Sequence, residues 1–335
     1  MSELRQDRLS GEWVIVAPER GARPRQLKEH GHDAATPAHD PNCPFCPGSE
    51  AMLTEILAES PTQTPPGWLT RILPNRFPAL SPDAPAESRT EGIYGAAGGR
   101  GLHQVIVESP RHDADLPFMN DESITAVVAA WQRVHGEMIA APGVEAVFLF
   151  RNRGLKAGAS LRHPHSQAIA THFVPPRLAA REARARTLYN ETGRCPLCEI
   201  LEFELGEGSR VFLESEHFAA MVPFAATCPF EFLIVPRRHA ACFSAVMKEE
   251  AAELGEVLSE ALRRLYDVAG DPPYNLALET ASRGEANSPC QHWHLRIAPD
   301  ITTPNGFDLA AGMPVNPRLP EADTEALRTA TTKRN

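Results

Sequence analysis

Short runs in which apolar and polar residues alternate dominate this sequence, and a period of two predicts β-strands. A further strand enters at Arg71 and ends in a proline-framed turn near Pro78. Prolines, glycines and alanines fill residues 81–100, which we expect to form a long loop, and we expect a second loop over 304–317. The other predicted strands lie at 12–17, 103–108, 145–150, 210–214, 217–222, 230–235, 274–279 and 291–297.

Other segments carry apolar residues at helical spacing and predict amphipathic helices. The first starts at Asp121, which we expect to cap it, and places Ile124, Trp131 and Met138 on one face. The second covers residues 248–268. A charged helix is expected over 176–189 and a short one from Pro320 onward. Because strands and helices are mixed along the whole chain, the predicted fold class is α+β.

The order of these features repeats once along the chain. A Cys-Pro-Phe-Cys motif is followed by a strand ending in Ser-Pro-Arg-His, a helix, a strand and a His-Pro-His motif. A Cys-Pro-Leu-Cys motif then precedes a strand ending in Pro-Arg-Arg-His, a helix, a strand and a His-Trp-His motif. We interpret this order as a structural duplication, with one domain over 1–175, a second over 176–335, and their sheets paired.

Each half of the repeat supplies two cysteines and two histidines in the same order. Two thiolates and two imidazoles suit tetrahedral Zn²⁺, and four protein ligands leave no position for a substrate, so we expect a structural metal in each half. The alternative is that the histidines only end strands while the cysteines pack in the core. The predicted ligands are Cys43, Cys46, His112 and His163 in the first half and Cys195, Cys198, His239 and His292 in the second.

Composition narrows the functional classes. The 335 residues carry a net charge of -10, which argues against a protein that coats nucleic acid and favours a small anionic ligand for the local basic loops. No apolar run approaches the ~20 residues of a membrane helix, and the polar start MSELRQDRLSGEW predicts no secretory leader, so we expect a cytoplasmic protein. Seven cysteines in that compartment indicate metal ligands or buried thiols rather than disulfides.

A basic, glycine-containing loop leads directly into the first histidine pair. In extended backbone His163 and His165 face the same side, and the proline between them favours an edge or bulged strand. If His163 binds metal, His165 remains free as a nucleophile towards phosphorus, with Gln167 on the same face to hold a phosphoryl oxygen. The alternative is that both histidines serve only zinc or a core hydrogen bond. We expect phosphate charge to be neutralised by the loop residues Arg153, Lys156, Gly158 and Ser160 and by backbone N–H groups.

The second histidine pair differs from the first at one position. His294 is followed by Arg296 where His165 is followed by Gln167, and the preceding segment is not basic. We therefore expect a structural or secondary role for His294.

HPHSQ, preceded by Asn-Arg-Gly-x-x-x-Gly-Ala-Ser, resembles the histidine-triad-related hexose-1-phosphate nucleotidylyltransferases. This is the galactose-1-phosphate uridylyltransferase family, which includes ADP-glucose phosphorylase-like members. The resemblance extends over almost the whole chain. It includes the opening segment through Arg20, the first cysteine pair, and the segments 75–80, 108–112 and 306–317.

This resemblance implies two histidine-triad-like domains whose antiparallel sheets form a half-barrel with helices packed outside, usually in a homodimer. It implies double displacement, in which His165 attacks the α-phosphorus of a nucleotide sugar and a sugar 1-phosphate or phosphate takes up the nucleotidyl group. It places Gln167 and Ser160 with His165 among the catalytic residues. The implied substrate-binding residues are Arg20 and Arg23 near the nucleotide, Asn75 and Arg76 near the base and ribose, and Asn152, Gly158, Ala159, Ser160 and Gln167 at the phosphates.

The leading hypothesis is uridylyl transfer between UDP-glucose and galactose 1-phosphate. The alternative within the same chemistry is ADP-glucose phosphorylase, because galactose-specific relatives lack the second cysteine motif. They also carry a Tyr-Glu pair where Ala311 and Gly312 stand here, and an acidic residue where Arg76 stands. An alternative of another class is a zinc protein that binds nucleotides without turnover.

Overall fold

One antiparallel sheet of ten strands forms the centre of the molecule, in the order β10-β11-β12-β14-β13-β8-β9-β7-β4-β3. The computed structural model describes residues 1–22, 36–85, 87–301 and 306–331. In the first half of the sheet lie β3 (Ala58–Pro61), β4 (Trp68–Pro74), β7 (Gly101–Val107), β8 (Ala146–Arg153) and β9 (His165–Thr171). In the second half lie β10 (Val211–Glu214), β11 (Phe218–Met221), β12 (Phe232–Pro236), β13 (Tyr274–Glu279) and β14 (His294–Pro299).

The strand order confirms a duplicated α+β fold with open antiparallel sheets. Outward from the seam between β8 and β13, the first half runs β8, β9, β7, β4, β3 and the second runs β13, β14, β12, β11, β10. Helix α1 (Asp121–Ala140) precedes β8 in the chain just as α4 (Lys248–Ala269) precedes β13. The exact division at 175/176 stays a prediction.

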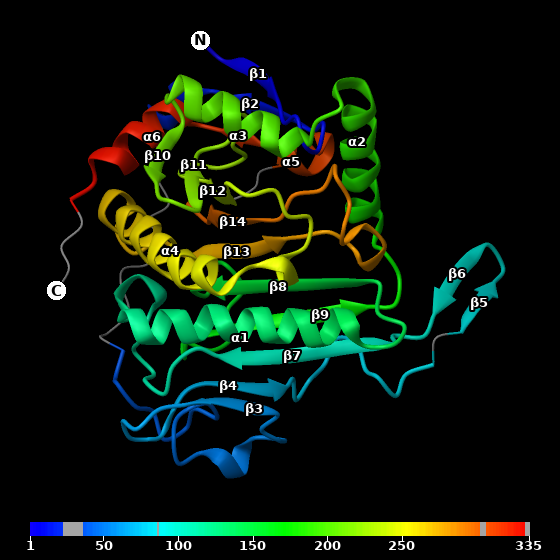
Figure 1. Cartoon of the computed structure of the whole chain (residues 1–335), viewed down its shortest axis with the longest axis vertical. Helices are drawn as coiled ribbons and strands as arrows, with labels where there is room; N and C mark the ends of the chain where they lie inside the picture. The colour runs from blue at the N-terminus through cyan, green and yellow to red at the C-terminus, as the bar shows by residue number, and fades with distance from the viewer. Residues whose placement is uncertain (23–35, 86, 302–305, 332–335) are drawn as a thin grey trace.

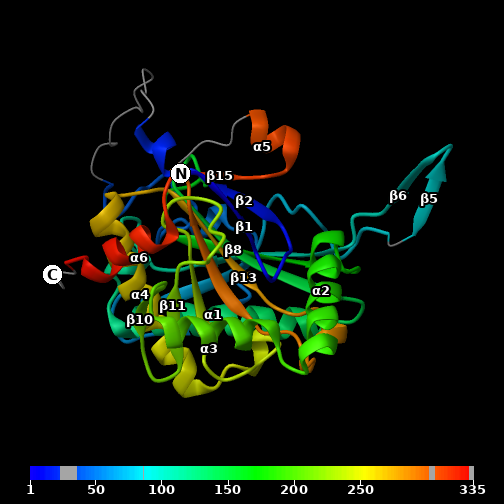
Figure 2. The ribbon, with the colours of Figure 1, turned by 90° about the horizontal axis from the view of Figure 1, so that it is seen from above.

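The two long helices pack side by side across one face of the sheet (Figures 1 and 2). Their apolar stripes, which include Trp131 of α1 and Leu258 of α4, form the main hydrophobic core with inward residues of both half-sheets. Gly255 lets the helices approach, since an added Cβ there would lie 3.2 Å from Ile124. Asn120 caps α1 by accepting a hydrogen bond from the Ser123 N–H, so the predicted cap at Asp121 was wrong by one residue.

The opposite face is covered unequally. In the second half, α3 (Pro196–Glu207) packs Leu197 and Leu201 against Leu233 and Val235. In the first half, Phe45 and its neighbours cover only a small cluster on β4 and β7. Burial alternates along β8 and β9, and on this second face Phe148, Phe150, Gln167 and Ile169 are partly buried, whereas His165 and Thr171 are buried. The predicted nucleophile is therefore a buried residue on a partly exposed face.

Several elements were not predicted, since they lie in segments without a clear apolar period. The expected loop at 81–100 contains a hairpin, β5 (Ser88–Glu91) and β6 (Tyr94–Ala97), that projects from the body (Figure 1). The expected loop at 304–317 contains α5 (Gly306–Ala311) and β15 (Val315–Asn316). β15 pairs with β2 (Trp13–Val16), which pairs with β1 (Glu3–Gln6). Cys195 directly precedes α3, a helix for which no element was expected from the sequence.

The remaining elements complete the description. They are α2 (Pro176–Thr192), α6 (Pro320–Thr329) and the short 3₁₀ helices η1 (Pro18–Ala22), η2 (Glu50–Met52), η3 (Leu116–Phe118), η4 (Phe243–Ala245) and η5 (Arg283–Glu285). Among the described residues, none of the helices combines the length and the apolar character that crossing a membrane requires.

Candidate active site

His165 is the first residue of β9 and lies between β8 and β7, so the expectation of an edge or bulged strand was wrong. Pro164 precedes the strand, where its missing N–H interrupts no ladder. The Nδ1–H of His165 donates to the carbonyl oxygen of His163 at 2.8 Å. Since a carbonyl can only accept, the proton is on Nδ1 and the lone pair is on Nε2. Burial lowers the pKa of His165, which favours the neutral imidazole.

Strand register aligns His165 with polar residues of neighbouring strands. The last pair in the β8–β9 register is Phe150 with Gln167, and Asn152 and His165 lie two residues beyond it on their own strands, on the same face of the sheet. β13 in turn pairs Asn275 with Asn152. Side chains at these positions point to the partly exposed face, since residues on a strand alternate between faces. The second repeat therefore contributes a residue to the face of the sheet that carries His165.

The amide of Gln167 is oriented by two residues beside it. His103 accepts a hydrogen bond from the Ala79 N–H through Nδ1, so its Nε2 carries the proton and donates to Gln167 Oε1 at 2.9 Å. Asn75 Nδ2 donates to the same oxygen at 3.4 Å. With its oxygen held in this way, the NH₂ group of Gln167 is available as a donor. Sequence reasoning missed His103, because only the β7–β9 register brings it beside Gln167.

The loop after β8 is built differently from the expectation. Arg151 and Arg153 were expected in a basic anion-binding loop, with Arg153 neutralising phosphate charge, but Arg151 donates to Glu108 and Asp115, and Arg153 donates to Asp115 and Asp271. Those carboxylates already compensate both guanidinium charges.

The backbone of the same loop is also engaged. The N–H groups of Gly158 and Ala159 donate to the carbonyls of Leu155 and Gly154, so these two amides close the loop and do not face a ligand. Gly154 and Gly158 have positive φ values of 84° and 90°, which glycine adopts without strain. The side-chain amides of Asn152 and Gln167 therefore become the better candidates for phosphate donors.

The first cysteine–histidine set assembles as predicted. Cys43, Cys46, His112 and His163 are all buried, and their ligand atoms lie within 4.8 Å of one another. The sulfur-to-Nδ1 distances of 3.5 to 3.7 Å match the edge of a tetrahedron with bonds of 2.0–2.3 Å, which is about 3.3–3.8 Å. The Nε2–H of His163 donates to the carbonyl of Ser109 at 2.7 Å, which leaves Nδ1 free to bind.

The second cysteine–histidine set also comes together, but two of its four residues are accessible to solvent. The Cys198 sulfur lies 3.4 Å from Nδ1 of both His239 and His292. Cys195 and His292 are buried, whereas Cys198 is partly exposed and His239 is exposed. Nε2 of His292 has no hydrogen-bond partner among the described residues. Both sets could bind a metal ion and are compatible with zinc.

The first metal set touches the predicted nucleophile. The Phe45 ring, between the two cysteines, packs with its centroid 5.5 Å from that of His165 and 5.9 Å from that of His163. Burial raises the pKa of the Cys43 thiol to about 11, and a bound cation would lower it again by stabilising the thiolate. A metal in this set would therefore fix the turn that supports one side of His165.

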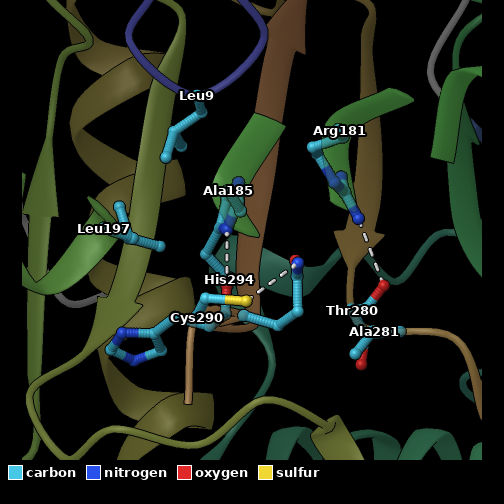
Figure 3. Close-up of a pocket in the computed structure, with 10 residues that line it drawn as sticks. Leu9, Arg181, Ala185, Leu197, Thr280, Ala281, Cys290 and His294 are labelled. Atoms are coloured by element: carbon cyan, nitrogen blue, oxygen red, sulfur yellow. Dashed lines mark hydrogen bonds between the residues drawn. The ribbon is translucent and has the colours of Figure 1, made fainter. Parts of the chain in front are cut away.

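His294, the counterpart of His165, lies in a different environment. It lines a cavity of about 30 Å³ closed by Leu9, Ala185 and Leu197, with Arg181 and Cys290 nearby (Figure 3). This space holds little more than a water molecule or two. Burial is the main cause that lowers the pKa of His294 to about 3. His294 is thus buried beside apolar side chains of the second repeat.

The other predicted site residues are less closely connected. Ser160 is exposed and makes no hydrogen bond to His165 or Gln167 within the described part of the chain. Arg76 is exposed and donates to the Met52 carbonyl beside Asn75. Arg20 lies exposed in η1, and none of its contacts in the described ranges reaches His165. Arg23 lies outside the described residues.

Comparison with known proteins places these observations in a family. Residues 1–175 match the model of the galactose-1-phosphate uridyl transferase N-terminal domain, and residues 182–302 match that of its C-terminal domain. The chain is 33% identical to an ADP-glucose phosphorylase of Arabidopsis thaliana, over 97% of this chain and 92% of that protein. It is 31% identical to a galactose-1-phosphate uridylyltransferase of Thermotoga maritima, over 98% of both.

A solved structure agrees with these sequence matches. The crystal structure of an ADP-glucose phosphorylase from Arabidopsis thaliana with bound ADP-glucose matches with a TM-score of 0.85. The match covers 99% of this chain and 100% of that one, at 30% identity.

Proposed function

Because the chain belongs to the galactose-1-phosphate uridylyltransferase family, we propose that its nucleotidyltransferase activity proceeds through a covalent nucleotidyl-His165. The donor is a nucleotide sugar, and the acceptor is a sugar 1-phosphate or inorganic phosphate. The observation that carries this proposal is the Nδ1 hydrogen bond from His165 to the His163 carbonyl, which aims the Nε2 lone pair away from the backbone.

Two displacements at phosphorus make up the reaction. His165 Nε2 forms a P–N bond to the α-phosphorus as the bond from phosphorus to the sugar 1-phosphate oxygen breaks, and the sugar 1-phosphate leaves with that electron pair. An oxygen of the incoming phosphate then attacks phosphorus and breaks the P–N bond. No proton needs to move in either step. The imidazole is positively charged in the intermediate, and the His163 carbonyl stabilises its Nδ1–H.

The amides of Gln167 and Asn152, which lie on the same face of the sheet as His165, supply donors to the phosphoryl oxygens in this proposal. Their N–H groups stabilise charge that develops at phosphorus without the cost of burying another ion. Asn75 has a positioning role, since it helps to hold the Gln167 oxygen.

We propose Zn²⁺ as the occupant of both cysteine–histidine sets. Four protein ligands fill a tetrahedral shell, so the metal would hold the turn at 43–46 and the start of α3 in place and take no part at phosphorus. We further propose that the protein works in the cytoplasm as a homodimer.

The identity of the nucleotide, uridine or adenosine, distinguishes two candidate reactions. Uridylyl transfer between UDP-glucose and galactose 1-phosphate is our first candidate, and it follows the family model and the Thermotoga maritima relative. A second candidate is adenylyl transfer from ADP-glucose to phosphate. Two observations favour it: the similarity to the plant ADP-glucose phosphorylase over nearly the whole chain, and the second metal set.

Intact-mass measurement separates the candidates. The purified protein is incubated separately with UDP-glucose and with ADP-glucose, without an acceptor. A UMP adduct supports the first candidate and an AMP adduct the second, and His165→Ala should abolish either. Absence of an adduct with both donors, or an adduct that persists in His165→Ala, would contradict the proposed mechanism.

A further inference from the structure

Asn275 lies in the second repeat but hydrogen-bonds to residues of the first repeat. It is the second residue of β13, pairs with Asn152 of β8 across the seam, and is exposed on the same face as His165. Its Nδ2 group donates two hydrogen bonds, one to Asn152 Oδ1 at 2.9 Å and one to the Ala157 carbonyl at 2.8 Å. One side chain therefore joins β8 to the middle of the loop that follows it.

These two bonds determine how the Asn152 amide lies. Because the oxygen of Asn152 faces Asn275, its NH₂ group must point away from Asn275. That nitrogen lies beside Gly158, where an added Cβ would be 3.5 Å from it. The Asn152 NH₂ group therefore lies beside Gly158 of the loop, on the face of the sheet that carries His165.

The arrangement parallels that of Gln167, which lies two residues after His165 on β9. The Gln167 oxygen is held by His103 and Asn75, and its NH₂ group is left as a donor. Asn275 has the same relation to Asn152 as His103 has to Gln167. Since the loop arginines are compensated by carboxylates, neutral amides with fixed orientation are well suited to bind an anionic phosphoryl group.

We propose that Asn275 is a positioning residue for phosphate recognition, through which the second repeat orients the Asn152 amide and the 154–160 loop. The inference rests on the proposed function, because it assigns the phosphoryl group to the side of His165. Asn275 itself needs no contact with substrate, and its contribution passes through Asn152 and the Ala157 carbonyl.

A double-mutant cycle between Asn275 and Asn152 tests this proposal. Binding of UDP-glucose and of ADP-glucose is measured by calorimetry in a His165→Ala background, where no covalent step can occur. Asn275→Ala should weaken binding of the recognised nucleotide sugar about fivefold, the effect of one lost net hydrogen bond. When Asn152 is already alanine, Asn275→Ala should change the logarithm of the dissociation constant by less than about half as much as it does in the presence of Asn152.

Asn275→Asp provides a sharper form of the test. A carboxylate cannot donate, so it should attract the Asn152 NH₂ group and turn the Asn152 oxygen towards the phosphate. We expect Asn275→Asp to weaken binding of the nucleotide sugar more than about tenfold. The midpoint of thermal unfolding should change no more than it does in Gln132→Ala. Gln132 is a suitable control because its amide donates one hydrogen bond, to the Val246 carbonyl, in a different part of the fold.

With the native His165, the rate of adduct formation at saturating nucleotide sugar gives a second readout. We expect Asn275→Ala to lower this rate about tenfold. Additive effects of Asn275→Ala and Asn152→Ala on binding, or unchanged binding in Asn275→Asp, would overturn the inference. Failure of the wild-type protein to form an adduct would instead overturn the proposed function, and the binding cycle would still decide the role of Asn275.

Discussion

A buried histidine in α1 should make the protein sensitive to acid. His135 is fully buried, its ring packs edge-on against Phe243 at 5.9 Å, and neither ring nitrogen has a hydrogen-bond partner among the described residues. Burial lowers its pKa from 6.5 to about 4. We predict that His135→Leu stabilises the protein, and does so more strongly as the pH falls.

The size of this effect follows from proton binding by the two states. In the unfolded chain His135 binds a proton as the pH falls below 6.5, whereas in the folded chain it stays neutral until about pH 4. The unfolded state therefore binds more protons than the folded state between these two pKa values, and the free energy of unfolding decreases as the pH decreases. Between roughly pH 7.5 and pH 5 the loss from His135 alone is about 2 kcal/mol. Removal of two unpaired ring nitrogens adds about 1–3 kcal/mol at any pH.

Urea unfolding of wild type and His135→Leu at both pH values measures this difference. Metal ligands also titrate, but both proteins share them, so their contribution cancels in the comparison. Met138→Leu is a suitable control, since Met138 is buried in the same helix and does not titrate. If wild type and His135→Leu lose stability in parallel between the two pH values, His135 is not buried as a neutral group and the reasoning fails.

Two further predictions concern β9 and the metal sets. Trp131→Phe should lower the free energy of unfolding by about 1–3 kcal/mol, measured with urea, because the Trp131 Nε1–H donates to the buried Ser166 hydroxyl at 2.7 Å and phenylalanine cannot. Adding Ser166→Ala to this variant should recover part of the loss, since it removes the unpaired hydroxyl. A chelator with a colorimetric zinc indicator should remove metal from the second set before the first, because Cys198 is partly exposed and His239 is exposed there, whereas all four ligands of the first set are buried. Cys198→Ser should abolish the fast phase, Cys46→Ser should abolish the slow one, and the reverse assignment would refute the argument.

The repeat and the metal sets could be predicted because their information is local. Each cysteine pair is a short motif, and the histidines follow strands whose apolar alternation is visible in the sequence. The strand order then places the corresponding residues of both halves in corresponding positions. The hairpin at 88–97 was not predictable in this way, since its strands are exposed and bury no apolar face.

The residues that orient the site's side chains could not be predicted, because their positions depend on the register between strands far apart in the sequence. His103 reaches Gln167 only because β7 pairs with β9, and Asn275 reaches Asn152 only because β13 pairs with β8. The same limitation explains the error at Arg153. A basic residue in a glycine-containing loop suggests an anion site, but the carboxylate of Asp271 that pairs with it is distant in the sequence.

The cysteine motifs of the two halves form different local structures beside the paired histidines. In the first half the motif forms turns, and Phe45 within it packs against His165. In the second half the motif leads into α3, whose Leu197 helps to close the cavity around His294. A metal in the second set would hold α3 in that position. Under the proposed function, the second repeat contributes to phosphate binding through the seam, where Asn275 hydrogen-bonds to Asn152, and not through its own histidine.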